Sequence, residues 1–329
     1  MAVPTLTTIL KRILKQPTAP FHEYHVRGEI EALLRDCPNV KLKCDRFGNL
    51  HATYKNGKRV TKDQWVLGAH MDHPGFVKTP GGKGWDFLGG VAPEVVAAGV
   101  KKGLRKAKGD LATWKFPVKV TDEKIEAHAC DDLVGCAAIV ATFWGLASLD
   151  IKTTVHAVFT RAEEVGFLGA WHVAKKWPYK DEAVFVSVET SRPVNGAVMG
   201  RGPVVRIGDR LSVFDADAID EIMRTATAQG VRVQRTLLDA GACEASAVRA
   251  AGYRSVGISI PLGNYHNTDD KRRIAPEFVM TRDVEDLVSL LKGLVGVKSS
   301  NLGVRSLEER FEVRMKENAD YLKAAKKKF

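Results

Sequence analysis

Residues 133–177 read LVGCAAIVATFWGLASLDIKTTVHAVFTRAEEVGFLGAWHVAKKW. The apolar run from Leu133 to Leu149 predicts a buried helix, because apolar residues occupy every face of it. TTVHAVFT, which ends at Thr160, is rich in β-branched residues and predicts a strand, and 167–177 predicts a second helix. Helix, strand and helix in succession form the repeating unit of an α/β fold.

The same alternation extends over most of the chain. Further strands are predicted for QWVLGAH to His70, AVFVSVE to Glu189, GPVVRIG to Gly208 and YRSVGISI to Ile260. Further helices are predicted at 5–14, 22–34, 215–229, 243–251 and 281–295, with a hairpin at 40–57. We therefore predict the α/β class, with a central mixed β-sheet flanked by helices.

Two segments depart from this alternation and set the predicted domain boundaries. Residues 74–126 are rich in Gly and Lys and predict a small inserted β subdomain within a discontinuous α/β domain of 1–73 and 127–297. Residues 298–329 are charged but place apolar side chains on one helical face. We expect this amphipathic helix to dock on the body and to end in a basic tail. The face consists of Leu307, Phe311, Met315, Ala319 and Leu322.

The composition defines the class of protein but not its partner. With 329 residues, 45% of them hydrophobic, the chain can bury a large core, which excludes disorder as the main state. The net charge of +11 suits nucleic acid, an anionic surface or acidic substrates. The amino terminus lacks a signal core, and the five cysteines form no CxxC pair. We expect a cytoplasmic protein with reduced thiols and no membrane partner.

One basic run raises the possibility of an anion-binding protein. KKGLRKAKG, at 101–109, has five positive charges and no acid. No aromatic residue interleaves it to stack on bases, and charge runs are commonly solvated faces. We therefore expect no nucleic-acid partner, although a basic binder remains an alternative.

Histidines and acids follow the ends of the predicted strands or open the apolar helix. In an open α/β sheet, ligands bind at the carboxyl ends of the strands. Acids crowded there without a cation would raise one another's pKa values. Imidazoles and carboxylates are ligands of Zn²⁺, and a bridging carboxylate permits a two-metal centre. The residues concerned are His70, Asp131, Asp132, Glu163, Glu164, Glu189 and His266.

Each of these residues also has an ordinary structural explanation. Asp131 and Asp132 suit a helix N-cap, and Glu163 and Glu164 suit a solvated helix start. We interpret the other histidines as core or surface residues. All of these explanations holding together at one edge of a sheet is less plausible than a metal centre.

Five motifs, in this order, resemble those of the co-catalytic zinc aminopeptidases: GAHMDHPGF, ACDDLVG, RAEEVGFLGA, VSVETS and NYHNTDD. The likeness is greatest to the glutamyl and deblocking aminopeptidases related to the tetrahedral aminopeptidases, and it extends over most of the chain. It implies a fold like that of zinc peptidases and phosphorylase-like hydrolases.

The resemblance implies a role for each matching residue. His70 and Glu189 would bind the first metal, Glu164 and His266 the second, and Asp131 would bridge them. Asp72 would orient the imidazole of His70, and Glu163 would be the general base that takes a proton from water and returns it to the leaving amine. The bond between Asp131 and Asp132 is a cis peptide in relatives, and we predict it here.

The departures from the family pattern surround the metal ligands without removing one. His73 replaces a usual Glu, Leu133 a usual Arg, and Glu189 the more frequent Asp, while ACEA around Glu244 replaces a TDA-like segment. The insertion is shorter than in the tetrahedral enzymes, so we expect a homo-oligomer, with a dimer favoured over a dodecamer.

We therefore predict a metallo-aminopeptidase that uses two divalent ions, zinc first and cobalt or manganese as alternatives, and that acts on peptides. The alternatives are a metal-dependent carboxypeptidase, an N-acyl amino acid amidohydrolase, or a basic nucleic-acid binder on a disused peptidase scaffold.

Overall fold

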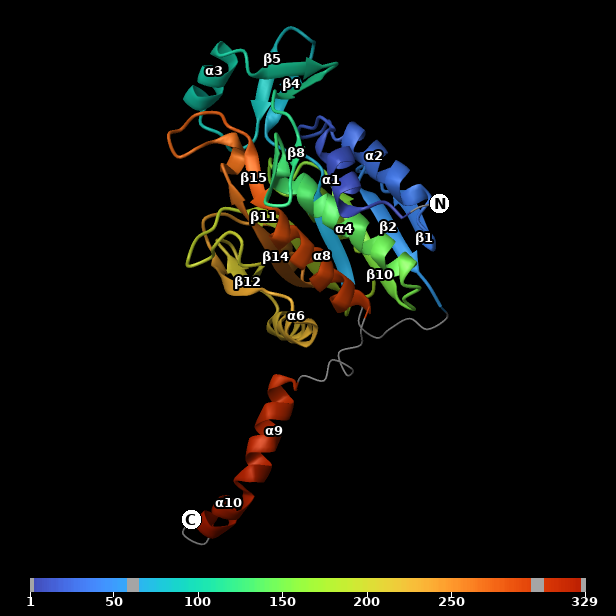
Figure 1. Ribbon diagram of the computed structural model, residues 1–329, viewed down its shortest axis with the longest axis vertical. Helices are drawn as coiled ribbons and strands as arrows, with labels where there is room; N and C mark the ends of the chain where they lie inside the picture. Colours follow the sequence, from blue (N-terminus) through green and yellow to red (C-terminus); the bar gives the residue numbers. More distant parts are fainter. Residues whose placement is uncertain (1–2, 58–64, 297–304, 327–329) are drawn as a thin grey trace.

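A computed structural model describes residues 3–57, 65–296 and 305–326. Eleven strands of these ranges form one mixed sheet, in the order β1-β2-β10-β3-β11-β14-β15-β9-β8, with β12 and β13 branching from β14 (Figure 1). Its strands are β1 (Val40–Cys44), β2 (Leu50–Lys55), β3 (Trp65–His70), β8 (Lys119–Val120), β9 (Lys124–Ala127), β10 (Thr154–Thr160), β11 (Val184–Ser191), β12 (Val204–Asp209), β13 (Gln234–Leu238), β14 (Arg254–Gly263) and β15 (Glu277–Met280).

The centre of the sheet is parallel. Strands β10, β3, β11 and β14 are neighbours and run the same way, whereas β2 and β15 pair antiparallel on either side of them. Alternate residues of these strands contribute to two separate cores: Leu67 and Val186 belong to one, and Val66 and Phe185 to the other. Because successive side chains of a strand point to opposite faces, both faces of the sheet are covered. The α/β fold with a central mixed sheet is confirmed.

Helices form the layers on the two faces (Figure 1). Helix α4 packs against α1, α8, β3 and β11, and α5 and α7 pack together on the other core. By length and composition α4 is apolar enough to cross a membrane, but 83% of its apolar window is buried inside the fold, which makes it a core helix. The helices of the body are α1 (Leu6–Leu14), α2 (Tyr24–Arg35), α3 (Pro93–Lys101), α4 (Cys130–Ser148), α5 (Leu168–Lys176), α6 (Ala216–Gln229), α7 (Glu244–Ala250) and α8 (Thr281–Gly296), with the 3₁₀ helix η1 (Tyr265–Asn267).

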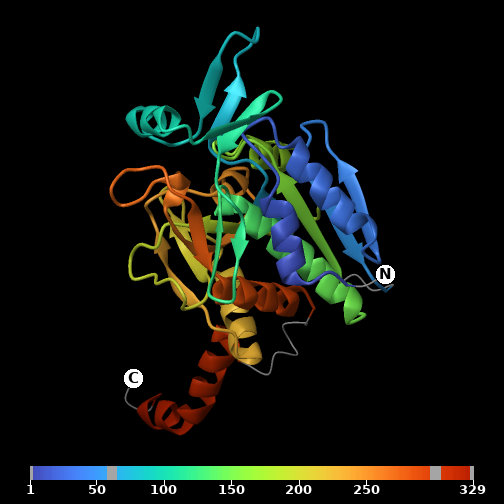
Figure 2. The same ribbon diagram turned by 45° about the horizontal axis from the view of Figure 1, so that its top comes forward.

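Much of the predicted insertion is a separate small sheet. Its order is β5-β4-β7-β6, and with α3 it stands off one end of the main sheet (Figure 2). Strand β8 and all of β9 except Ala127 also lie within 74–126, but the two strands join the main sheet through β15. The division into domains stays a prediction. The strands of the small sheet are β4 (Gly75–Lys78), β5 (Trp85–Leu88), β6 (Arg105–Lys108) and β7 (Leu111–Trp114).

The carboxyl-terminal helices do not dock on the body, so that expectation was wrong. Helices α9 (Leu307–Glu317) and α10 (Ala319–Lys326) extend away from it (Figure 1). No residue of α9 is buried, and Leu307, Phe311 and Met315 are each more than half exposed. Helical periodicity reports that one face is apolar but not what covers it. Residues 298–304 and the end of the predicted basic tail, 327–329, lie outside the described residues.

Candidate metal centre

The predicted site residues gather at the carboxyl edge of the parallel strands. Because β10, β3, β11 and β14 are parallel neighbours, the loops that follow them meet at one edge. His70 is the last residue of β3, Glu163 and Glu164 follow β10, Glu189 lies near the end of β11, His266 lies in η1 after β14, and Asp131 lies in the first turn of α4.

Asp131 lies between the two histidines. Its Oδ1 is 3.3 Å from Nε2 of His70, and its Oδ2 is 3.8 Å from Nε2 of His266. Oε2 of Glu189 is 3.6 Å from Nε2 of His70. Oε2 of Glu164 is 3.1 Å from Nε2 of His266. Each imidazole therefore belongs to one of two neighbouring groups of side chains, and the two groups share the carboxylate of Asp131.

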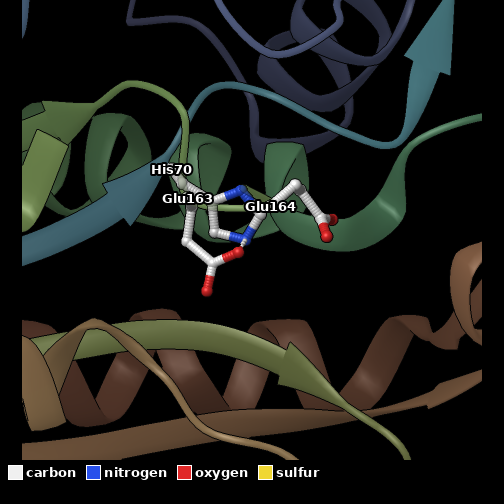
Figure 3. Close-up of side chains that lie close together, drawn as sticks. All are labelled: His70, Glu163 and Glu164. Carbon is white, nitrogen blue, oxygen red and sulfur yellow. Dashed lines mark ion pairs between the residues drawn. The ribbon is translucent and has the colours of Figure 1, made fainter. Parts of the chain in front are cut away.

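Glu163 and Glu164 are adjacent in the sequence, but their carboxylates point in different directions (Figure 3). Glu163 points toward the His70 ring, with Oε2 3.9 Å from Nε2. Glu164 turns away from it and reaches His266. Their side chains are only 11% and 4% exposed, so each carboxylate is held in a largely dry site.

Candidate ligand atoms form three compact sets in the described part of the chain, each with its atoms within 4.8 Å of one another. One set contains Asp132, which the sequence analysis left outside the ligand set. The DD dipeptide was its only signal. A cis peptide bond joins the two aspartates, as predicted. The sets are His70, Glu163 and Glu164; His70, Asp132 and Glu189; and Asp131, Glu164 and His266.

Asp72 organises the loop that follows β10. Its two carboxylate oxygens accept hydrogen bonds from the backbone N–H groups of Glu163 and Glu164, at 2.9 and 3.1 Å. Nδ1 of His70 lies 3.1 Å from the backbone oxygen of Asp72 and 3.7 Å from its carboxylate. Asp72 therefore positions both glutamates, and its main chain is the closer partner of the imidazole.

Two buried residues that the sequence analysis did not select support the backbone of the site. Glu277 accepts hydrogen bonds from the N–H of Asp131 at 3.0 Å and from the N–H of His266 at 2.8 Å. His73 bonds the backbone oxygen of Asp131 at 2.6 Å and Oδ1 of Asn267 at 2.9 Å. The sequence signal that could have identified Glu277 is that it is a lone acid in the otherwise apolar strand β15.

The charges of the site are strongly coupled. Burial disfavours the imidazolium of His70, but Glu163 and Asp131 outweigh burial and raise its pKa well above the usual range. Burial lowers the pKa of His266, and Glu164 outweighs it and raises the pKa to about 9. Burial, together with neighbouring carboxylates, raises the pKa of Glu163 well above its usual range. The crowded carboxylates therefore favour the protonated forms of these three side chains.

Several carboxylate oxygens have no hydrogen-bond partner among the described residues. Oδ1 of Asp131, Oδ2 of Asp132 and Oε1 of Glu164 are fully buried and unpaired in this way. A buried carboxylate oxygen is costly unless a donor or cation satisfies it. Imidazole nitrogens and carboxylate oxygens together form a donor set that suits zinc and similar divalent ions. These residues therefore fit a metal centre.

Residues 93–276, more than half of the chain, match the family model described as M42 glutamyl aminopeptidase. The chain belongs to this family. The resemblance inferred from the motifs is confirmed, and the aminopeptidase assignment takes precedence over the alternative activities.

Solved structures of similar proteins share the fold. The TET1 peptidase of Pyrococcus horikoshii is 21% identical with a TM-score of 0.71, over 88% of this chain and 99% of that one. The aminopeptidase APDkam598 of Desulfurococcus kamchatkensis is 19% identical with a TM-score of 0.72, over 91% and 96%. The TET aminopeptidase of a marine sediment thaumarchaeote is 16% identical with a TM-score of 0.74, over 88% and 96%.

The assembly of one of these similar structures is large. TET1 of P. horikoshii is described as assembling into a tetrahedron or a large octahedral shell, and one structure is a dodecamer. This finding weighs against the dimer that we expected from the short insertion.

In this M42 chain a cavity adjoins the metal-site residues. It is lined by His70, Asp131, Glu163, Glu189 and His266 and by the arginines Arg192 and Arg206. Arg206 is 2% exposed and donates to the hydroxyls of Ser191 and Ser259 and to the carbonyl of Leu238. It forms no ion pair with any described residue, and its Nε has no partner there.

Proposed function

We propose that this chain is an aminopeptidase with a dinuclear metal centre. His70 and Glu189 would hold the first ion and Glu164 and His266 the second, and the carboxylate of Asp131 would be shared between the two sites. The supporting observation is that the two oxygens of Asp131 face two different histidines, each accompanied by a second carboxylate. Asp132, grouped with His70 and Glu189, is an additional ligand candidate for the first ion.

Zinc suits this donor set best, with cobalt or manganese as alternatives. Bound ions would supply Lewis acidity toward the scissile carbonyl and toward water. A titration with each metal, read by inductively coupled plasma mass spectrometry, should saturate at two ions per chain. A single ion at saturation would contradict the dinuclear assignment.

Glu163 is the general base in this proposal. Its side chain lies at the cavity, it is directed to the His70 ring, and its backbone is fixed by Asp72. From there its carboxylate takes a proton from water and returns it to the leaving amine. Glu163→Gln keeps the shape of the side chain and removes the base, so the kcat should fall at least about 100-fold.

The control for Glu163→Gln is Glu182→Gln, because Glu182 is an exposed acid away from the cavity. Both variants should retain the wild-type metal content. Full peptidase activity in a metal-loaded Glu163→Gln enzyme would show that the base has been wrongly assigned.

The preferred amino-terminal residue is acidic. Arg206 supplies a buried positive charge in the cavity wall without a carboxylate partner among the described residues. Burying such a charge is costly unless an anion pairs with it. A substrate glutamate or aspartate would provide that anion, in line with the family description as glutamyl aminopeptidase.

The test compares glutamyl and leucyl anilides. Arg206→Met should lower kcat/KM for the glutamyl substrate at least about tenfold and leave the leucyl substrate little changed. Arg210→Met, at an exposed arginine outside the cavity, is the matched control. An equal loss on both substrates would exclude charge recognition by Arg206.

We also propose that the enzyme is a homo-oligomer in the cytoplasm. All five cysteines are free thiols, which fits a reducing compartment. Light scattering after gel filtration would measure the assembly, and a monomer at micromolar concentration would contradict this proposal.

A further inference from the structure

A second hollow lies away from the metal centre, between the small sheet and the end of α1. Its volume is about 410 Å³. Segments far apart in the sequence form its wall: the residues after α1, strands β6 and β7, the segment after β7 and the link between β9 and α4. They contribute Lys15, Pro17, Lys106, Lys108, Thr113, Trp114, Lys115, Phe116, Pro117 and His128.

The hollow is strongly basic. Four lysines line it, and none of its lining residues is an acid. In strand β6, Lys106 and Lys108 are two residues apart and share a face. Arg105 belongs to the opposite face, where its guanidinium lies over the rings of Phe76 and Trp85. The run that the sequence singled out as basic is therefore divided by the strand into two faces, and one of them faces this hollow.

These four lysines have no acidic partner among the described residues. Lys119 and Lys124, which follow in the chain, both pair with Glu126, at 3.5 and 2.9 Å. No ion pair involves Lys15, Lys106, Lys108 or Lys115 in the same described ranges. No acid of the described residues thus compensates the positive charge of the hollow.

Two buried polar atoms of the wall are also unpaired. Trp114 is 2% exposed and its indole nitrogen has no hydrogen-bond partner among the described residues, and the same holds for Nε2 of His128, which is 6% exposed. Burial, with His73 and Lys106, lowers the pKa of His128 to about 3, so its ring is neutral. An indole N–H can only donate, so its missing partner must be an acceptor.

We propose that this hollow binds the phosphate group of a small phosphorylated compound. A phosphate dianion provides both the negative charge that four lysines attract and several acceptor oxygens for the indole N–H. The hollow falls in the size range of small-molecule sites and is larger than a single phosphate needs. The partly exposed ring of Phe116 in the wall offers an apolar surface to the organic part of the ligand.

The test uses the full-length protein and isothermal titration with AMP, adenosine and inorganic phosphate at low ionic strength. AMP should bind saturably with a stoichiometry of one, and adenosine should not bind. Weaker binding of inorganic phosphate than of AMP supports a phosphate ester as the ligand. Equal binding of both identifies free phosphate as the ligand of the same site.

A matched pair of variants separates the site from general charge. Lys106→Gln/Lys108→Gln removes two lysines of the hollow and should weaken AMP binding at least about tenfold. Lys101→Gln/Lys102→Gln removes the same charge from the same basic run, outside the hollow, and should change it less than about twofold. All four positions are exposed, so both variants should keep the wild-type unfolding midpoint.

A second variant tests the buried donor. Trp114→Phe keeps an aromatic ring and removes the indole N–H, and it should weaken AMP binding about fivefold. Equal losses in the two lysine variants, or no saturable binding of AMP or phosphate to the wild-type protein, would overturn the proposal.

Discussion

Glu277 connects two elements of the candidate metal centre, and removing its carboxylate should loosen both. One oxygen accepts from the N–H of Asp131 at the start of α4, and the other from the N–H of His266 in η1. Glu277 is fully buried in β15. We consider Glu277→Ala, which removes both acceptors, and Glu277→Gln, which keeps the size of the side chain and one acceptor.

The hydrogen bonds give the expected magnitude. A hydrogen bond to a charged group contributes about 1.5–3 kcal/mol to stability. Glu277→Gln loses one of the two and should lower the free energy of unfolding by about that amount. Glu277→Ala loses both and leaves a cavity, at a cost of roughly 3–6 kcal/mol, which is comparable to the whole stability of some proteins. The glutamine variant is therefore the informative one.

Urea unfolding and metal affinity measure the effect. Burial raises the pKa of Glu277 to about 7, so both assays should be made at pH 8, where the carboxylate is ionised. In Glu277→Gln, we expect weaker metal binding as well as lower stability, because the backbones of Asp131 and His266 are no longer held together. Loss of stability with unchanged metal affinity would limit Glu277 to a structural role.

Glu126→Gln provides the control, because Glu126 lies on the neighbouring strand β9 and its ion pairs within the described residues are with Lys119, which is exposed, and Lys124, which is partly exposed. It should cost less than about 1 kcal/mol and leave metal affinity unchanged. Wild-type stability and wild-type metal affinity in Glu277→Gln would refute the reasoning.

Four further predictions concern stability. Burial lowers the pKa of His156 to about 4 from its ordinary 6.5, so between these pH values the unfolded chain binds a proton that the folded chain does not. The contribution of His156 to stability should therefore be complete above pH 6.5 and fall below it by up to about 1.4 kcal/mol per pH unit. His156→Gln should flatten this slope, as measured by urea unfolding. A Cβ on Gly68 in strand β3 would lie 2.2 Å from Cζ of Phe185, so Gly68→Ala should cost about 1–3 kcal/mol. Gly28→Ala in helix α2, where a Cβ meets nothing within 4 Å, should instead raise the unfolding midpoint by the equivalent of about 0.5–1 kcal/mol. Deleting residues 305–329 should change the free energy of unfolding by less than about 0.5 kcal/mol, because no residue of α9 is buried; a larger loss in calorimetry would reveal a hidden contact.

The layout of the candidate site follows from local sequence. The apolar strands that end at His70 and Thr160 and the strand around Glu189 can be predicted from the local residue pattern. Parallel strands present their carboxyl ends at one edge, so residues just beyond those ends must gather. Strand periodicity and this topological rule together are sufficient to predict where the site lies.

The partners that come from elsewhere in the chain were not readable in this way. Glu277 contacts Asp131 from a distant strand, and Lys15 and Lys106 line the same hollow. Neither pair has a sequence spacing that would identify it, because contacts between distant segments depend on how whole elements pack.

The carboxyl-terminal helix is a second case in which the sequence did not determine a contact between distant segments. Its apolar stripe of Leu307, Phe311 and Met315 was correctly assigned to a helix, but the expected docking was wrong. The sequence by itself determined the α/β class, the order of the motifs and the sheet edge on which the acids and histidines lie, because these depend on local periodicity. Only the tertiary structure decided which carboxylate faces which imidazole and which apolar faces are covered, because burial and charge pairing are properties of surfaces that meet after folding.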